Sequence, residues 1–527
     1  MLKQFSSFFE TKWAVLIILL VFVCFKIPHL FYPYYCDEAW VYIRAVKTMV
    51  ANGPSLMPGC IPDDCARGHP LLFHFLCSLW IRCFGASNFA VHSFALLVSL
   101  ALLTSVYECS RKLFGHRTGL AALLLLATNV LFFVQSAFIL PEVAVALFTL
   151  LSLYYYVNDR FLLTLVMLTL LFFIKESGLI FGLVLGVDAM LMSFRARQSV
   201  GRRVMRITAL LIPALLIGTF FLVQKARLGW YLSPEHSSLV HLEWSTFYPL
   251  FKHGLDCIFR ADVNNYLFIF CFILLSTIPA IKLRDVRYLF LFIPATAIYV
   301  LTCTEITGGI ADIIKAVFVI LSLIIALFCL FKLSDTYSLP AQRFVIIMGC
   351  CFVAYLGYLS LSLVEYRYLL VDMVFVFIFM ALCLNTFINA SGNQFYLIAI
   401  AAVLIMGAYG FYADEGNSDS DLESFHAMHV QQKEISFLEQ ANAYDDEIII
   451  GCYWAIWHFK DPKESYLSTN KPFSQITHGI IGPTTCYAIF DNICDTSNYQ
   501  KVKDNPAFKL VFSAAESRSW AEIYNQN

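Results

Sequence analysis

The stretch FYPYYCDEAWVYIRAVKTMV, residues 31–50, decides how this chain is organised. It follows an apolar run, residues 13–31, that is long enough to cross a bilayer, since a spanning helix needs about 20 residues. Two acids, Asp37 and Glu38, come directly after the run. The apolar residues behind them, Trp40 first, recur at helical spacing and predict a short amphipathic helix along the membrane surface. Ionisable groups at membrane depth are costly, so a pair at the mouth of the first span indicates a function.

The composition is that of a polytopic membrane protein. The chain has 527 residues, of which 59% are hydrophobic and 14% are charged, far from the averages of soluble proteins. The net charge is −1, so a basic surface for nucleic acid is not indicated and we expect no nucleic-acid partner. The first apolar run follows lysines and has no small-residue cleavage site, which predicts an uncleaved anchor.

Apolar segments recur along residues 1–412, and by length they predict about thirteen transmembrane helices. The predicted fold class is therefore mainly α. The predicted spans are residues 13–31, 86–109, 118–138, 142–157, 161–174, 177–193, 207–224, 266–282, 288–303, 313–331, 344–362, 368–386 and 395–412.

The loops between these spans divide by charge. The densest basic loops are residues 110–119, 193–206 and 282–287, and they alternate with the long loops at 32–85 and 225–265. With a cytoplasmic N-terminus, the basic loops face the cytoplasm, as the positive-inside rule requires. The long loops and everything after residue 412 then face outward.

The last part of the chain, residues 413–527, predicts a small soluble α/β domain, while residues 1–412 form the transmembrane domain. A polar linker at 413–424 leads into a helix expected over 425–442. Strands are expected at 447–454, 486–490 and 508–512.

Ionisable residues gather at the outward ends of the spans. Each one alone is explained by solvation at the interface, by helix capping or by a long side chain reaching for water. Their repeated placement in short outer turns instead predicts one polar cavity that opens just above the bilayer. These residues are Asp37, Glu38, Arg67, His69, Glu142, Lys175, Glu176, Glu305, Glu365 and Arg367.

Such a cavity fits sugar transfer from a lipid carrier. A carboxylate can take the proton of an acceptor hydroxyl as a general base, and cations can stabilise a departing phosphate. An amphipathic helix in the interface gives a lipid-bound substrate a place to enter. The chemistry predicts transfer from a polyprenyl-phosphate donor to a hydroxyl, with one base, one displacement and inversion at the anomeric carbon.

The order of motifs resembles that of membrane glycosyltransferases of the GT-C class. The motifs are Asp-Glu at 37–38, Gly-His-Pro-Leu at 68–71, Pro-Glu at 141–142, the lysine turn IKESG at 174–178 and Arg-Tyr-Leu at 367–369. The chain is most similar to the branch of protein O-mannosyltransferases and lipid A aminoarabinose transferases, best over residues 30–190. The resemblance implies a many-span body with a soluble outer tail in a bacterial inner membrane.

The resemblance also implies roles for individual residues. Asp37 would be the general base, Glu38 would shape the pocket or contact the acceptor, and Glu142 stands where the family often has an aspartate. Asp37, Glu38 and His69 would be the ligands if a divalent metal binds, as in some members. The residues expected near the donor phosphate are Arg67, His69, Lys175, Arg367 and Tyr368.

Two departures from the family pattern bear on the substrate. Pro70 is followed by Leu71 rather than by a second proline, and Arg-Gly-His at 67–69 replaces the acid-lysine pair of the aminoarabinose enzymes. The second departure reduces the match to aminoarabinose transfer. The acceptor stays open between lipid A, a surface glycan and a protein hydroxyl.

The loop at residues 224–265 is rich in aromatic residues and contains His236 and His241. It reads either as a cover that orders over the bound donor or as an anchor in the membrane interface, and we favour the cover. Arg260, near its end, is a reserve candidate for binding the donor phosphate.

A transporter or flippase of lipid-linked sugars is the alternative function, and a non-catalytic scaffold is a third. Transporters keep their sites near mid-span and often show internal repeats, whereas this sequence has few charges near mid-span and no repeat between its halves. The acidic triplet Asp419-Ser420-Asp421 spells a nucleotide-sugar motif, but in an outer linker we interpret it as a solvated turn. The glycosylation signal at 389–391 falls on the predicted cytoplasmic side.

Overall fold

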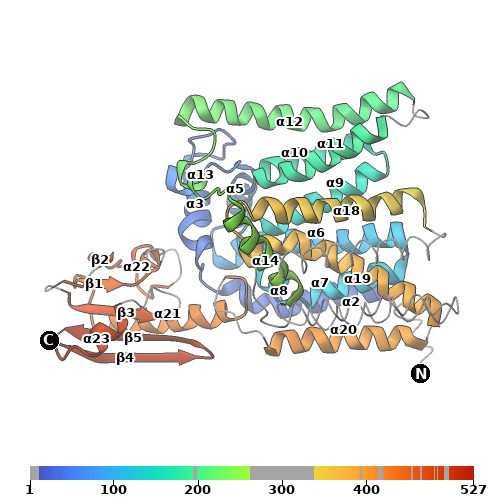
Figure 1. The fold of residues 1–527 in the computed structure, drawn as a ribbon. Helices are drawn as coiled ribbons and strands as arrows, with labels where there is room; N and C mark the ends of the chain where they lie inside the picture. Colours follow the sequence, from blue (N-terminus) through green and yellow to red (C-terminus); the bar gives the residue numbers. More distant parts are fainter. Residues whose placement is uncertain are drawn as a thin grey trace.

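The computed structural model describes residues 11–193, 199–260, 337–391, 394–413, 419–452, 455–462, 466–479, 481–482, 485–491 and 498–526. A body of long helices lying side by side carries a small sheet domain at one end, and the N-terminus lies at the other end (Figure 1). Six helices of the described part are long and apolar enough to cross a membrane. The predicted mainly α class is confirmed.

The body is built from helices that span or cap the apolar layer. They are α2 (Lys12–Lys26), η1 (Ile27–Phe31), η2 (Glu38–Ile43), α3 (Arg44–Asn52), α4 (Asp63–Ala66), α5 (Leu72–Phe84), α6 (Asn88–Phe114), α7 (His116–Ala127), α8 (Val130–Gln135), α9 (Glu142–Val157), α10 (Phe161–Ile174), η3 (Glu176–Gly178), α11 (Leu179–Ser193), α12 (Val200–Leu228), α13 (Pro234–Ser238), α14 (Trp244–Arg260), α18 (Leu339–Leu359), η5 (Tyr366–Leu369), α19 (Leu370–Ser391) and α20 (Gln394–Ala413).

Several predicted spans agree with the structure. Helices α9 and α10 begin and end at the predicted residues. The span predicted at 118–138 is instead two helices, because the side chain of Asn129 caps a new helix by accepting from the backbone N of Phe132. The spans predicted at 266–331 lie outside the described residues, so the count of thirteen stays a prediction.

One helix of the body was missed. Helix α5 is apolar and 13 residues long, and it lies within the segment 32–85 that the sequence predicted as an outer loop. It is too short to span a bilayer alone. It lies at the same end of the body as the sheet domain (Figure 1), and it packs against α3 and α6.

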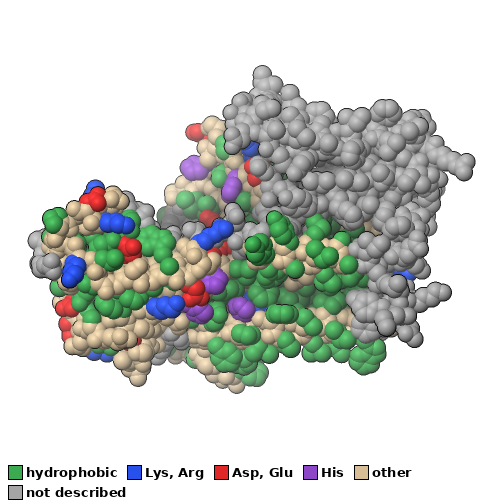
Figure 2. Space-filling view, turned by 90° about the horizontal axis from the view of Figure 1, so that it is seen from below, with side chains coloured by type: hydrophobic (Ala, Val, Ile, Leu, Met, Phe, Trp, Pro, Cys, Tyr) green, Lys and Arg blue, Asp and Glu red, His purple; other side chains and the backbone are tan. Residues whose placement is uncertain are grey.

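Close packing holds the body together. A Cβ atom built on Gly119 would approach the carbonyl oxygen of Tyr107 to 2.7 Å, so this glycine lets α6 and α7 come into close contact. Leu150 of α9 and Phe377 of α19 are fully buried between such helices. Figure 2 shows mainly hydrophobic side chains on the described surface of the body, as a lipid-facing protein requires.

The end of the body opposite the sheet domain carries basic residues. Arg202 and Arg206 approach Asp159 at 3.9 and 2.7 Å, and Arg343 pairs with Asp188 at 2.7 Å. The turn after α9 and the start of α12 therefore share one end, as the predicted alternation of loops requires.

The sheet domain follows α20. It consists of α21 (Glu423–Gln440), β1 (Ile448–Ile450), α22 (Ile456–Lys460), β2 (Ile476–His478), β3 (Tyr487–Asp491), α23 (Tyr499–Lys503), β4 (Phe508–Glu516) and β5 (Ser519–Gln526). The strand order is β2-β1-β3-β5-β4. Strand β1 is parallel to β2 and β3, whereas β5 is antiparallel to β3 and β4. The α21 helix and three of these strands fall where the sequence predicted them.

The sheet domain is docked on the stretch that opens the chain. The hydroxyl of Tyr466 donates to the backbone O of Tyr34 at 2.9 Å. Lys47 pairs with Asp461 at 2.9 Å, and the guanidinium of Arg44 lies 3.9 Å from the ring centroid of Trp457. The first outer segment is thus a platform for the sheet domain.

We expect Tyr466→Phe to destabilise this docking by about 1 kcal/mol, because it removes the hydrogen bond from the Tyr466 hydroxyl to the backbone O of Tyr34. The shift in Tm of the purified protein measures the effect. Lys471→Ala removes a pair that is mostly exposed, with Asp445 76% exposed, and serves as the control with an unchanged Tm. Equal Tm values for both variants would contradict the docking role of Tyr466.

Candidate active site

The site is built around Asp37, at the turn between the first membrane helix and the platform. Cys36 adopts a left-handed φ of 48°, which is uncommon for a residue with a side chain, and the π-helical turn η2 starts directly after Asp37. The carboxylate of Asp37 accepts a hydrogen bond from Trp40 Nε1 at 3.0 Å and pairs with Arg367. Its side chain is only 16% exposed.

The charges around Asp37 keep it ionised. Burial by itself raises the pKa of Asp37, but the charges of Arg367 and Arg67 and the hydrogen bonds from Arg367 and Trp40 lower it further than burial raises it. The net pKa lies below the ordinary value for an aspartate. Asp37 is therefore a carboxylate at neutral pH and can accept a proton.

A chain of contacts links Asp37 to the other predicted cations. Arg367, on the turn η5, donates from Nη2 to Asp37 and lies 3.4 Å from the hydroxyl of Tyr368. Lys175 Nζ lies 4.2 Å from the ring centroid of Tyr368 and pairs with Glu142 at 3.0 Å. The structure thus brings together residues from four separate turns, as the sequence predicted.

Arg67 is a second cation near Asp37, and its charge lowers the pKa of that carboxylate. Its guanidinium is 4.3 Å from the ring centroid of Trp40, whose Nε1 holds Asp37. Among the described residues, none forms an ion pair with Arg67. Stacking on an indole orients a guanidinium while leaving its donors available, so Arg67 is the cation best placed to receive an anion.

The Gly-His-Pro-Leu segment forms one wall. His69 Nδ1 lies 2.8 Å from Glu176 Oε2, so this imidazole is engaged by the lysine turn. Gly68 has a φ of +82°, and a Cβ there would lie 2.8 Å from the backbone N of Ser233. Only glycine permits this approach of the loop that follows α12.

The segment 224–265 has two distinct parts. Its beginning covers the wall, since Gln224 Nε2 donates to the backbone O of Gly68 at 3.3 Å and of Tyr231 at 2.6 Å. Further along, Leu242 and Trp244 are 82% and 63% exposed, as in an interfacial anchor. The side chains of Arg260 and His236, and all of Glu305, lie outside the described residues.

Glu38, the neighbour of Asp37 in the chain, is a buried residue. It is fully buried, and its Oε1 atom lies 3.0 Å from His92 Nε2 and accepts from the backbone N of Ile139 at 2.7 Å, while its Oε2 atom accepts from the backbone N of Tyr35 at 3.3 Å. In this arrangement it has no surface for a substrate, so of the two roles that the resemblance implied the structure favours shaping the pocket over contacting the acceptor.

The structure does not bring the three suggested metal ligands together. Asp37 pairs with Arg367, Glu38 with His92 and His69 with Glu176. Among the residues that the structure describes, no three His, Cys, Asp or Glu side chains are grouped to hold a metal ion. The suggested ligands do not fit a shared metal, and we derive no step through one.

The interpretation of the Asp419 triplet as a solvated turn is wrong. Asp419 is 7% exposed and pairs with Arg367, and Asp421 is also buried. Burial raises the pKa of Asp419 to about 6, although the charge of Arg367 opposes this. Residue spacing carries no signal for this contact, because 52 residues separate Asp419 from Arg367.

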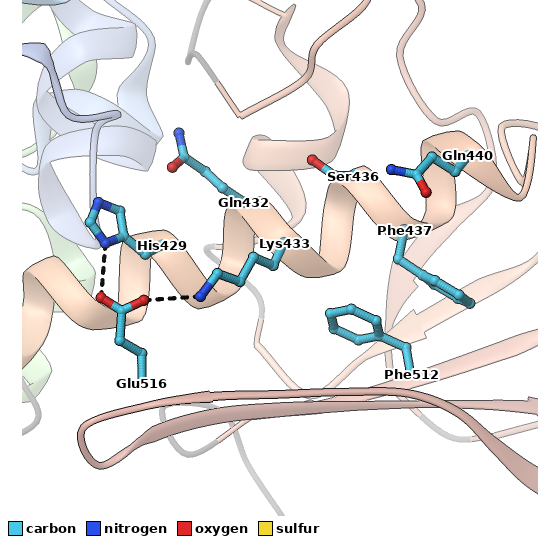
Figure 3. A pocket seen from close by; sticks show the side chains of 8 residues that line it. All are labelled: His429, Gln432, Lys433, Ser436, Phe437, Gln440, Phe512 and Glu516. Carbon is cyan, nitrogen blue, oxygen red and sulfur yellow. Dashed lines mark hydrogen bonds and ion pairs between the residues drawn. The ribbon is translucent and has the colours of Figure 1, made fainter.

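A separate hollow of about 470 Å³ lies between α21 and the end of β4 (Figure 3). Glu516 is held there by His429 at 3.0 Å and Lys433 at 3.0 Å, and Phe437 stacks on Phe512. None of the predicted site residues lines this hollow.

We expect Glu38→Ala to destabilise the fold by about 3–5 kcal/mol, because it removes one partner of a buried, hydrogen-bonded pair. The Tm of the purified protein checks this. Glu365→Ala, which truncates an exposed acid near the same turns, is the control and leaves the Tm unchanged. A Tm for Glu38→Ala equal to that of the control would refute the pocket-shaping role.

Comparison with known proteins supports the fold. Residues 68–231 match the family model described as dolichyl-phosphate-mannose-protein mannosyltransferase. These residues include His69, Glu142 and Lys175. The comparison with curated proteins gives no match.

Solved structures extend the comparison to the whole chain. The crystal structure of ArnT from Cupriavidus metallidurans bound to undecaprenyl phosphate is 12% identical, with a TM-score of 0.51 and 97% of each chain covered. The oligosaccharyltransferase of Archaeoglobus fulgidus is 12% identical, with a TM-score of 0.47, over 92% of this chain and 70% of that one. The mycobacterial arabinofuranosyltransferase AftD is 10% identical, with a TM-score of 0.40, over 96% of this chain and 40% of that one. The family-model match and the fold shared with the ArnT structure confirm the predicted resemblance to GT-C membrane glycosyltransferases, and the chain is a multi-pass membrane protein.

Proposed function

We propose that this protein is an integral-membrane glycosyltransferase that moves a sugar from a polyprenyl-phosphate donor to a hydroxyl acceptor. The observation that carries the proposal is an ionised, nearly buried Asp37 that pairs with Arg367 and lies within the field of Arg67, at the ends of membrane helices. One base and adjacent cations are what a single displacement at a sugar carbon needs.

In the proposed reaction, Asp37 acts on the acceptor hydroxyl, and the polyprenyl phosphate is the leaving group. Asp37 accepts the proton of the acceptor hydroxyl as that oxygen forms a bond to the anomeric carbon. The bond from this carbon to the phosphate oxygen breaks, and its electron pair leaves with the polyprenyl phosphate. Attack opposite the leaving group inverts the anomeric carbon.

Arg67 is the principal group for the donor phosphate. Of the predicted phosphate-binding residues, Lys175, His69 and Arg367 each face a carboxylate at 3.0 Å or less. Arg67 instead faces the indole of Trp40. Lys175 remains a second positive charge near the leaving group, with its charge partly offset by Glu142.

The position of the site on the helical body supports a lipid carrier and an acceptor on the outer face of the membrane. The ArnT structure that this chain resembles holds undecaprenyl phosphate, and the proposed site lies at the ends of the helices, where we expect a lipid-borne phosphate to enter. The basic turns lie at the opposite end, which favours a site on the outer face of a bacterial inner membrane, with the sheet domain outside. A hydroxyl of lipid A, a surface glycan or a protein is the acceptor.

The alternative, a transporter or flippase of lipid-linked sugars, predicts a different dependence on Asp37. Within the described helices, the pairs of opposite charge lie at the two ends of the body rather than at mid-depth, where transporters bind substrate. A flippase moves its lipid without breaking the sugar–phosphate bond, so it needs no general base.

We expect Asp37→Asn to lower the rate of sugar transfer by about 10²–10⁴-fold, because the amide cannot take the proton of the acceptor. Mass spectrometry of the lipids and envelope glycans of a strain carrying only the variant measures the missing product. Asp64→Asn, an exposed acid of the same segment, is the matched control and retains full product. Normal product from Asp37→Asn would refute the assignment of the base.

We expect Arg67→Gln to raise the KM for the lipid-linked donor about tenfold, since it loses one charge-assisted contact to phosphate. Arg82→Gln, at an exposed arginine that bonds the backbone O of Val50, should leave the KM unchanged. Steady-state transfer in reconstituted vesicles gives both values. A donor KM for Arg67→Gln equal to that of the control would place the phosphate elsewhere.

A further inference from the structure

Asp419 is a buried carboxylate of the site to which the proposed reaction has not yet assigned a role. It belongs to the segment that leads into the sheet domain, directly before α21. Its Oδ2 atom accepts from Arg367, its Oδ1 atom lies 3.2 Å from the hydroxyl of Ser420, and its backbone O accepts from Gln135 Nε2 at 2.8 Å. The backbone and the side chain of Asp419 are both held in place.

Arg367 holds two carboxylates with the two arms of one guanidinium. Nη1 donates to Asp419 and Nη2 donates to Asp37. A guanidinium is planar and its donors point in fixed directions, so each carboxylate fixes the direction of the other arm. Arg367 is only 6% exposed, and water therefore contributes little to its orientation.

When Asp37 and Asp419 share the charge of Arg367, Asp37 accepts a proton more readily. If Asp419 were neutral, the full charge of Arg367 would act on Asp37 alone. A carboxylate opposite an undivided cation holds its charge more firmly and accepts a proton less readily. A second carboxylate on the same cation therefore keeps Asp37 a more effective base.

We propose, resting on the transfer reaction above, that Asp419 is a positioning residue that fixes Arg367 and shares its charge, so that Asp37 can act as the base. The sheet domain thereby contributes a residue to the site in the membrane body. Asp419 does not contact the reacting atoms. It acts through Arg367.

The protonation state of Asp419 depends on its burial and on the charges near it. Burial raises its pKa to about 6 against the charge of Arg367, and the nearby acids Asp37, Glu142 and Glu365 act in the same direction as burial. The pKa of Asp37 lies below its ordinary value. With these pKa values, Asp419 takes up a proton as the pH falls through about 6 while Asp37 remains ionised. We therefore expect the rate to fall in this range because Asp419 is neutralised.

If Asp419 only held the sheet domain on the body, its replacement would affect kcat and the pH profile no more than replacement of another docking residue. The docking of that domain also uses Tyr466, Trp457 and Asp461. Asp461 is a matched control for Asp419, since it is also a sheet-domain carboxylate paired with a cation of the body, Lys47 at 2.9 Å. In contrast to Asp419, Asp461 pairs with a cation outside the site.

The test compares Asp419→Asn and Asp461→Asn with the wild type in reconstituted vesicles that contain a polyprenyl-phosphate-linked sugar. We expect Asp419→Asn to lower kcat about tenfold, to keep the donor KM within about twofold and to lose the fall in rate near pH 6. Asp461→Asn should keep the kcat and the pH profile of the wild type. A Tm equal to that of the wild type confirms that Asp419→Asn is folded.

Two kinetic results would overturn the proposal. One is a wild-type kcat and pH profile in Asp419→Asn. The other is a lower donor KM with an unchanged kcat, which would mean that Asp419 competes with the donor phosphate for Arg367. An inactive wild type would instead refute the proposed transfer.

Infrared titration tests the arrangement of Asp419 without turnover. We expect the wild type to gain a carboxylic-acid band near pH 6 that is absent from Asp419→Asn and present in Asp461→Asn. The same band in Asp419→Asn would assign the proton to another acid and contradict the proposal, whether or not transfer is observed.

Discussion

The ion pairs of Arg367 are the interaction on which the rest of the site depends. A buried guanidinium is tolerated only when carboxylates and hydrogen bonds replace the water it has lost. Here two aspartates do so, one 330 residues earlier in the chain and one 52 residues later. The first outer turn, a late membrane turn and the entry to the sheet domain are therefore fixed to one point.

This constraint gives the site its chemical asymmetry. Asp37 is an ionised acceptor of protons held by Arg367 and Trp40. Two cations do not pair with Asp37: Arg67 offers its charge over an aromatic ring, and Lys175 lies near Tyr368. The groups stand at the ends of packed helices, so the scaffold, rather than the substrate, holds them in place.

Much of the fold and part of the site could be predicted from residues alone. Long apolar runs bounded by turns predicted α9 and α10 to the residue, because burial in lipid imposes a simple length rule. Acids and cations at the ends of successive spans predicted the meeting of Asp37, Glu142, Lys175 and Arg367, because alternate turns of a polytopic protein share a face. Helix α5 was missed because 13 apolar residues fall short of a span.

The remaining features depend on contacts that leave no local pattern. The sequence suggests that Glu38 acts together with Asp37. Besides the backbone N of Tyr35, however, its partners are His92 and the backbone N of Ile139, 54 and 101 residues away. Asp419 lies in a polar stretch typical of solvated linkers, and only the folded chain shows that it is buried against Arg367. The break between α7 and α8 depends on a single side-chain cap at Asn129.

A structure of the Asp37→Asn protein with an intact polyprenyl-phosphate sugar bound would show most directly whether Asp37 is the base. We expect the phosphate to contact Arg67 and residue 37 to face the anomeric carbon from the side opposite the phosphate. A phosphate bound at the basic end of the body, or an anomeric carbon facing away from residue 37, would contradict this assignment.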